Sequence, residues 1–129
     1  MKTILVVDDS VADRKFMSLV FGEVGYRVLE AESGVEGLNI WKNHPEAIDL
    51  IMVDVVMPGM DGVEFFQTVR KLSPQQKVIF VSGFKSQFAV ARERATAFVE
   101  KSDNTDLFLK KVREILESKE SFVDVLRTD

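Results

Sequence analysis

The chain of 129 residues has the length of one domain, and 46% of its residues are hydrophobic, enough for a sizeable core. Its net charge of −4 argues against nucleic acid or an anionic membrane as a direct partner. The sequence has no cysteine, which excludes disulfides and thiolate metal sites. It shows no secretory signal and no apolar stretch long enough to span a bilayer, so we expect a cytoplasmic protein.

Short apolar segments alternate with amphipathic ones along the chain, which predicts a parallel α/β sheet. Strands are predicted at residues 4–7, 26–31, 50–53, 78–81 and 98–100. Ser10 is expected to cap the first helix, which Gly22 and Gly25 close, and Asp61 to cap a helix that runs to about residue 71. Further helices are predicted at residues 33–43, at residues 86–95 and from residue 104 onward.

Apolar residues recur at helical spacing in three of these helices and predict their buried faces. The three sets are Phe16, Met17, Val20 and Phe21; Val35, Leu38, Ile40 and Trp41; and Phe108, Val112, Ile115 and Leu116. We expect Trp41 to be a packing residue and the single histidine, His44, to be a solvent-exposed turn residue, both outside any site.

The segment after residue 118 fits two interpretations. Phe122, Val123 and Leu126 continue the helical spacing of the last helix, which could therefore extend further, or the segment is a frayed terminus. An extended helix would expose apolar residues and would need a second subunit, as in a homodimer through this helix, or a downstream domain. The expected division is a domain over residues 1–119 and a tail or helix extension over residues 120–129.

Three aspartates follow two of the predicted strands directly. Asp8 and Asp9 come after residues 4–7, and Asp54 comes after residues 50–53. Ligands of open α/β sheets bind beyond the carboxyl ends of the strands, so these carboxylates would converge if the two strands are neighbours. A cluster of hard, negative oxygens suits a magnesium ion and a phosphoryl group. Taken alone, the Asp pair is more often a helix N-cap, a role that Asp9 or Ser10 could fill.

Four motifs, in order along the chain, carry a resemblance to a known family. They are Ile4-Leu5-Val6-Val7-Asp8-Asp9, then Val53-Asp54 with Met57-Pro58-Gly59-Met60-Asp61-Gly62, then Val81-Ser82-Gly83, and then Phe98-Val99-Glu100-Lys101. Over roughly residues 2–119 the chain resembles receiver domains of two-component response regulators, and is similar to the single-domain chemotaxis receivers. The resemblance implies a flavodoxin-like, doubly wound, five-stranded parallel sheet in the order 2-1-3-4-5, with helices on both faces.

The resemblance also implies roles for the acidic residues. Asp54 would be the phosphoacceptor, taking a phosphoryl group from a sensor histidine kinase or a histidine phosphotransfer protein. Asp8, Asp9, Asp54 and the backbone carbonyl of Val56 would hold Mg²⁺.

Three residues of the later motifs would respond to the phosphoryl group. Ser82 would bind it, Lys101 would pair with it or with the carboxylate of Asp54, and Phe98 would change rotamer on activation. The protein would thus be a phosphorylation-controlled switch rather than a conventional enzyme, although it would catalyse its own phosphotransfer and dephosphorylation. Its output would pass through an unidentified protein partner or a downstream domain.

The sequence departs from the family pattern near the end of the site. Ser102 stands where the family has a proline preceded by a cis bond, and a cis bond before a non-proline residue costs about 3 kcal/mol. The interval between Ser82 and Lys101 is shorter than usual, and Arg94 stands where a glycine commonly closes a helix. These differences predict an intact phosphorylation site beside an unusual output surface.

Two other classes of function remain open on the sequence. One is a magnesium-dependent phosphohydrolase with an Asp nucleophile, although such enzymes favour two Asp residues spaced by one on a single strand end. The other is a binding module that uses the receiver fold without phosphorylation, which the altered segment after Lys101 allows.

Overall fold

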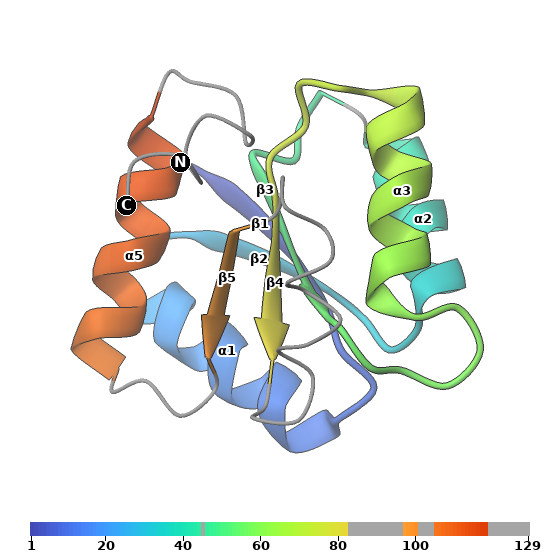
Figure 1. The fold of residues 1–129 in the computed structure, drawn as a ribbon. Helices are drawn as coiled ribbons and strands as arrows, with labels where there is room; N and C mark the ends of the chain where they lie inside the picture. The colour runs from blue at the N-terminus through green and yellow to red at the C-terminus, as the bar shows by residue number, and fades with distance from the viewer. Residues whose placement is uncertain (45, 83–96, 101–104, 119–129) are drawn as a thin grey trace.

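The computed structural model describes residues 1–44, 46–82, 97–100 and 105–118, and the side chains of all these except 82 and 97–100. The elements follow one another as β1 (Thr3–Val7), α1 (Val11–Glu23), β2 (Arg27–Ala31), α2 (Gly34–Asn43), β3 (Leu50–Asp54), α3 (Gly62–Leu72), β4 (Val78–Ser82), β5 (Ala97–Glu100) and α5 (Thr105–Glu117). The strands pair in parallel in the order β2-β1-β3-β4-β5. The predicted parallel α/β fold is therefore confirmed (Figure 1).

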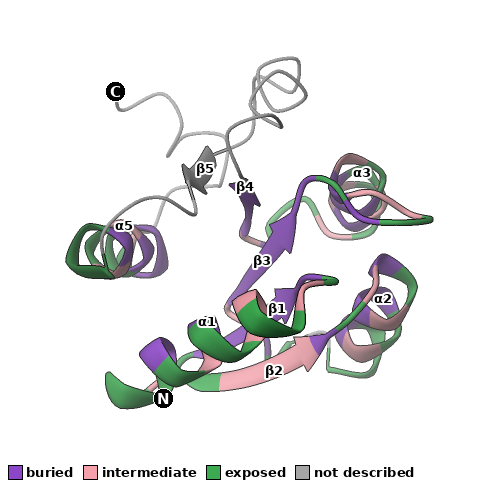
Figure 2. Cartoon of the chain, turned by 90° about the horizontal axis from the view of Figure 1, so that it is seen from below, coloured by how far each residue is buried: buried purple, intermediate pink, exposed green. Residues whose placement is uncertain are grey.

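The strands at the centre of the sheet are the most buried part of the molecule. Every residue of β1 and β3 is buried, whereas β2, at the sheet edge, is only partly buried (Figure 2). Uninterrupted apolar strands of this kind need cover on both faces. Helices α1 and α5 lie on one face of the sheet and α2 and α3 on the other (Figure 1). On the first face the rings of Phe21 and Phe108 stack with centroids 5.6 Å apart.

The helix starts agree with the predicted caps. Ser10 and Asp61 each accept a hydrogen bond from the backbone N–H three residues later, at 3.2 Å from Asp13 and 2.9 Å from Glu64. Ser33 does the same for α2, with 3.1 Å from Glu36. At the end of α1 the backbone turns through Gly25, whose φ of 90° lies in the region that favours glycine.

Two residues that the sequence predicts to be buried are exposed in the structure, so these two predictions are wrong. Phe16 in α1 is 52% exposed and Val35 in α2 is 58% exposed. The buried residues of α1 are Met17, Val20 and Phe21, and at about 100° per residue Phe16 lies outside the arc of the helix that these three span. In α2 the buried side instead runs through Gly34, Gly37, Leu38 and Trp41, and at Gly37 the absence of a side chain allows close approach to Val7 of β1.

The remaining packing predictions are confirmed where the structure describes them. Trp41 is buried and its indole N–H donates to Oε1 of the buried Gln76 at 2.9 Å, while His44 is exposed. In α5 the residues Phe108, Val112, Ile115 and Leu116 are all buried. The predicted helix at residues 86–95, Arg94, the peptide between Lys101 and Ser102, and the tail with Phe122, Val123 and Leu126 lie outside the described residues. No helix in the described part of the chain is long and apolar enough to cross a membrane.

Lys77 joins the start of β4 to the end of α5. Its ammonium donates to the backbone carbonyls of Ile115 at 2.6 Å and Leu116 at 3.3 Å, and to that of Ser118. These carbonyls belong to the last turn and the end of the helix, where a cation also interacts favourably with the helix dipole. Burial lowers the pKa of Lys77, the charge of Lys2 lowers it further, and Asp49 opposes the shift.

We predict that Lys77→Met lowers the free energy of unfolding by about 1–2 kcal/mol, because methionine keeps much of the apolar stem but leaves the helix carbonyls without this donor. Urea denaturation followed by circular dichroism measures the change. The matched control is Lys71→Met, which removes an exposed lysine from the last turn of α3. Equal losses in the two variants would contradict the role of Lys77.

Candidate functional site

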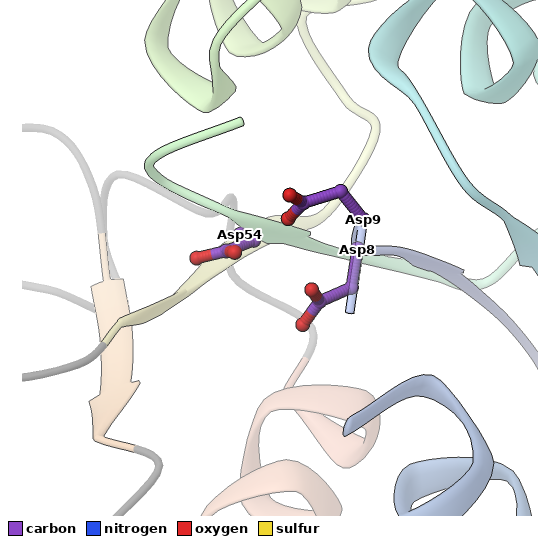
Figure 3. Close-up of side chains that lie close together, drawn as sticks. All are labelled: Asp8, Asp9 and Asp54. Carbon is purple, nitrogen blue, oxygen red and sulfur yellow. The ribbon is translucent and has the colours of Figure 1, made fainter. Parts of the chain in front are cut away.

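The three aspartates meet at the carboxyl ends of β1 and β3. Val7 pairs with Val53 in the parallel register of these strands, so Asp8 and Asp9 emerge beside Asp54, the last residue of β3. One carboxylate oxygen from each of the three side chains lies within 4.8 Å of the others (Figure 3). Asp8 and Asp54 are buried, with exposures of 1% and 8%, whereas Asp9 is exposed. The predicted convergence of the carboxylates is present.

Backbone and side-chain contacts fix Asp8 in place. Its N–H donates to the carbonyl of Ala31 at 3.1 Å, which extends the β1–β2 pairing by one residue. Its Oδ1 accepts a hydrogen bond from the N–H of Ser10 at 2.9 Å. Asp8 thus shapes the turn from β1 into α1, while Ser10 caps the helix. The N-cap role considered from the sequence belongs to Ser10, so the Asp pair is not explained by capping.

A close backbone contact holds the loop after Asp54. The N–H of Gly62 donates to the carbonyl of Val55 at 2.8 Å, which brings the start of α3 back onto the end of β3. A Cβ at Gly62 would lie 2.3 Å from the backbone oxygen of Asp54 and 2.8 Å from Cα of Val55. Between Val55 and Gly62 the chain turns at Gly59, whose φ is 73°. Val56, two residues after Asp54, is 65% exposed.

The donor set fits a hard divalent cation. Three carboxylates supply oxygen ligands only, which is the chemistry that Mg²⁺ prefers in proteins. Carboxylates crowded within 4.8 Å repel one another, and a bound cation offsets that repulsion. Asp8, Asp9 and Asp54 are the residues that could hold such an ion, and the exposed Asp9 leaves the cluster open on its solvent side.

The later motifs are described only in their backbone. Ser82 ends β4, the neighbour of β3 in the sheet, and Phe98 lies in β5, opposite Phe80 in the β4–β5 register. Their side chains and the whole of Lys101 lie outside the described residues, so their assigned roles stay predictions.

The sequence reasoning missed Arg14. Its Nη1 donates to the backbone carbonyl of Asp8 at 2.7 Å, and its Nε donates to Oε1 of Glu30 at 3.2 Å. No short-range pattern relates an arginine in α1 to a glutamate in β2, because the two meet only after β1 and β2 have paired. The only hint in the sequence was the position of Arg14, about one turn after the Ser10 cap. A cation near the N-terminus of a helix interacts unfavourably with the helix dipole, so an arginine there suggests another role.

The sequence profile of the response regulator receiver domain family matches residues 4–113. The chain belongs to this family. It is a receiver domain, and receiver domains are phosphoacceptor switches of two-component signalling, as the resemblance implied.

Similar proteins place this domain in different chains. Sensor kinase CckA of Brucella abortus is 36% identical over 122 residues, covering 92% of this chain but only 13% of the kinase. The structure of TrrA from Thermotoga maritima in complex with Mg²⁺–BeF is 33% identical, with a TM-score of 0.78 and coverage of 89% of this chain and 99% of that one. A CheY-like receiver domain protein from Methanospirillum hungatei is 31% identical, with a TM-score of 0.79 and coverage of 91% and 94%.

We predict that Gly62→Ala destabilises the protein by about 2–3 kcal/mol, because the new methyl group would overlap backbone atoms of Asp54 and Val55 that cannot move without shifting the end of β3. Chemical denaturation measures the change. The matched control is Gly22→Ala in α1, where nothing lies within 4 Å of a new Cβ, and stability is expected to be unchanged or to rise by up to about 1 kcal/mol. A Gly62→Ala protein as stable as the wild type would contradict the close approach.

Proposed function

We propose that this receiver domain is a phosphorylation-controlled switch that accepts a phosphoryl group on Asp54. The observation that supports the proposal most directly is the convergence of Asp54 with Asp8 and Asp9 at the strand ends of a chain that belongs to the receiver family. A sensor histidine kinase or a histidine phosphotransfer protein is the proposed donor, in keeping with relatives that are parts of sensor kinases.

In the proposed reaction a carboxylate oxygen of Asp54 attacks the phosphorus of a phosphohistidine. A P–O bond forms and the P–N bond breaks, and its electron pair remains on the imidazole, which takes up a proton. Bound Mg²⁺ would neutralise charge on the phosphoryl oxygens. Among the chain's own residues, Asp54 would act as the nucleophile, Asp9 would be the exposed metal ligand, and Asp8 would be the buried ligand whose position is fixed by the contacts with Ser10 and Ala31.

The proposal includes the remaining residues of the family pattern. The backbone carbonyl of Val56 would complete the metal ligands, Ser82 and Lys101 would bind the phosphoryl oxygens, and Phe98 would change rotamer. Ser82 ends β4, the neighbour of β3 in the sheet, and Lys101 follows β5 in the sequence, so both would fall at the strand ends where Asp54 lies. The metal cation, the Lys101 ammonium and the Ser82 hydroxyl would then stabilise the negative charge on the three phosphoryl oxygens.

The unit proposed to carry this function is the five-stranded, doubly wound receiver over residues 1–119, in the cytoplasm, with residues 120–129 as a tail or helix extension. Like other receivers, it would catalyse its own phosphotransfer and dephosphorylation. Its output would pass to a protein partner or a downstream domain. A second copy of the chain, bound through the last helix in a homodimer, is one such partner.

We predict that Mg²⁺ stabilises the wild-type protein and that Asp9→Asn removes most of this effect, because the exposed carboxylate is one of three oxygen ligands. At a Mg²⁺ concentration one hundred times Kd the gain in unfolding free energy is expected to be about 2.7 kcal/mol. Thermal denaturation with Mg²⁺ and with EDTA measures it. Glu23→Gln, which neutralises an exposed carboxylate at the end of α1, should keep the full gain.

A second prediction concerns the acceptor itself. After incubation with acetyl phosphate and Mg²⁺, the intact mass of the wild type should increase by one phosphoryl group, while Asp54→Asn should not be labelled, because an amide oxygen is a far weaker nucleophile than a carboxylate. Labelling of Asp54→Asn would disprove the assignment of the acceptor. Sustained turnover of phosphate esters would instead favour the magnesium-dependent phosphohydrolase.

A further inference from the structure

Arg14 is a nearly buried cation at the edge of the acidic cluster. It lies in the first turns of α1, and its side chain is only 11% exposed. Burying a guanidinium is unfavourable unless its donors are satisfied. Here Nε donates to Glu30 of the edge strand β2 at 3.2 Å, and Nη1 donates to the backbone carbonyl of Asp8 at 2.7 Å.

The second of these contacts reaches the peptide that joins two of the acidic residues. The carbonyl of Asp8 and the N–H of Asp9 belong to one planar peptide unit. A hydrogen bond to this carbonyl therefore fixes the orientation of the peptide plane that leads to Asp9. The N–H of Asp8 is already held by Ala31 and its Oδ1 by Ser10. Arg14 therefore adds a contact that helps to fix the peptide between Asp8 and Asp9.

Arg14 could affect a bound cation in two opposite ways. Its positive charge would repel a metal ion, whereas its hydrogen bond would hold the ligand peptide in a binding geometry. Glu30 limits the repulsion because it pairs with the guanidinium at 3.2 Å and contributes an opposite charge. The direction in which metal affinity changes when Arg14 is removed thus distinguishes an electrostatic role from a positioning role.

We propose that Arg14, itself held by Glu30, is a positioning residue that strengthens Mg²⁺ binding by fixing the Asp8–Asp9 peptide. The inference rests on the proposed function of the acidic cluster as a metal site. Groups that orient metal ligands in this way typically change metal affinity by about 10–100-fold when they are removed.

The test is isothermal titration with MgCl₂ of the wild type and four variants, each first shown by circular dichroism to be folded without the metal. Arg14→Ala is expected to weaken Mg²⁺ binding by about tenfold, although it removes a repelling charge. Arg14→Lys keeps the charge but not the planar fork of donors, and should recover only part of the affinity. Lys15→Ala is the matched control, since it removes the same charge from the next, exposed residue of α1 and should leave binding unchanged or slightly tighter.

Arg14→Lys keeps the inference testable if Arg14→Ala does not fold, because it keeps the charge and changes only the hydrogen-bond donors, so weaker Mg²⁺ binding in it cannot come from a changed charge. Glu30→Gln, the fourth variant, leaves the guanidinium without its opposite charge and should weaken Mg²⁺ binding severalfold. Mg²⁺ affinity equal to or greater than that of the wild type in a folded Arg14→Ala protein, or in Arg14→Lys where Arg14→Ala does not fold, would overturn the positioning role and leave the metal site intact. A wild-type protein that does not bind Mg²⁺ would overturn the proposed metal site and this inference with it.

Discussion

The crowding of three carboxylates at the ends of β1 and β3 is the constraint on which the rest of the structure depends. Two of them, Asp8 and Asp54, are buried, and all three have oxygens within 4.8 Å of one another. Such an arrangement opposes folding because like charges repel one another, and a bound cation would offset this repulsion. Burial of apolar surface also offsets this repulsion, because every residue of β1 and β3 is buried and the apolar core is built around these strands.

Close packing at two glycines and a hydrogen bond from Arg14 hold the segments that carry the acidic residues in place. Gly37 lets α2 approach the end of β1, where a Cβ would lie 2.8 Å from Cγ2 of Val7, and Gly62 lets α3 start directly on the backbone of Asp54. Arg14 secures the turn between Asp8 and α1 from the other side of the strand end. The turns that carry the three aspartates are therefore fixed by packing and hydrogen bonds, which would lower the cost of ordering them when an ion binds.

Local patterns predicted much of this arrangement because they depend on nearest neighbours in the sequence. The buried strands and the Ser10 and Asp61 caps follow from short segments. The convergence of the aspartates follows from the rule for parallel strand ends only together with the strand order that the family resemblance implied. The contacts that were missed join distant segments, as in the hydrogen bonds from Trp41 to Gln76 and from Arg14 to Glu30. Phe16 was misplaced because hydrophobicity alone does not choose between adjacent residues on a helix.

The three aspartates, Arg14 and the glycines that allow close packing at Asp54 and Val7 come from residues 3–62, from the start of β1 to the first residue of α3. Phe98, which is expected to change rotamer on activation, and α5 come later in the chain, and α5 is joined to the start of β4 through Lys77 at the end of the sheet opposite Asp54. The three aspartates therefore come from the first half of the chain, whereas Ser82 and Lys101, which are proposed to bind the phosphoryl group, come from the second half together with Phe98 and α5. This separation is consistent with relatives in which a similar domain forms 13% of a sensor kinase or nearly the whole of a CheY-like chain. Substitutions in the second half of the chain could then change what the switch controls while leaving the ligands of the acidic cluster in place.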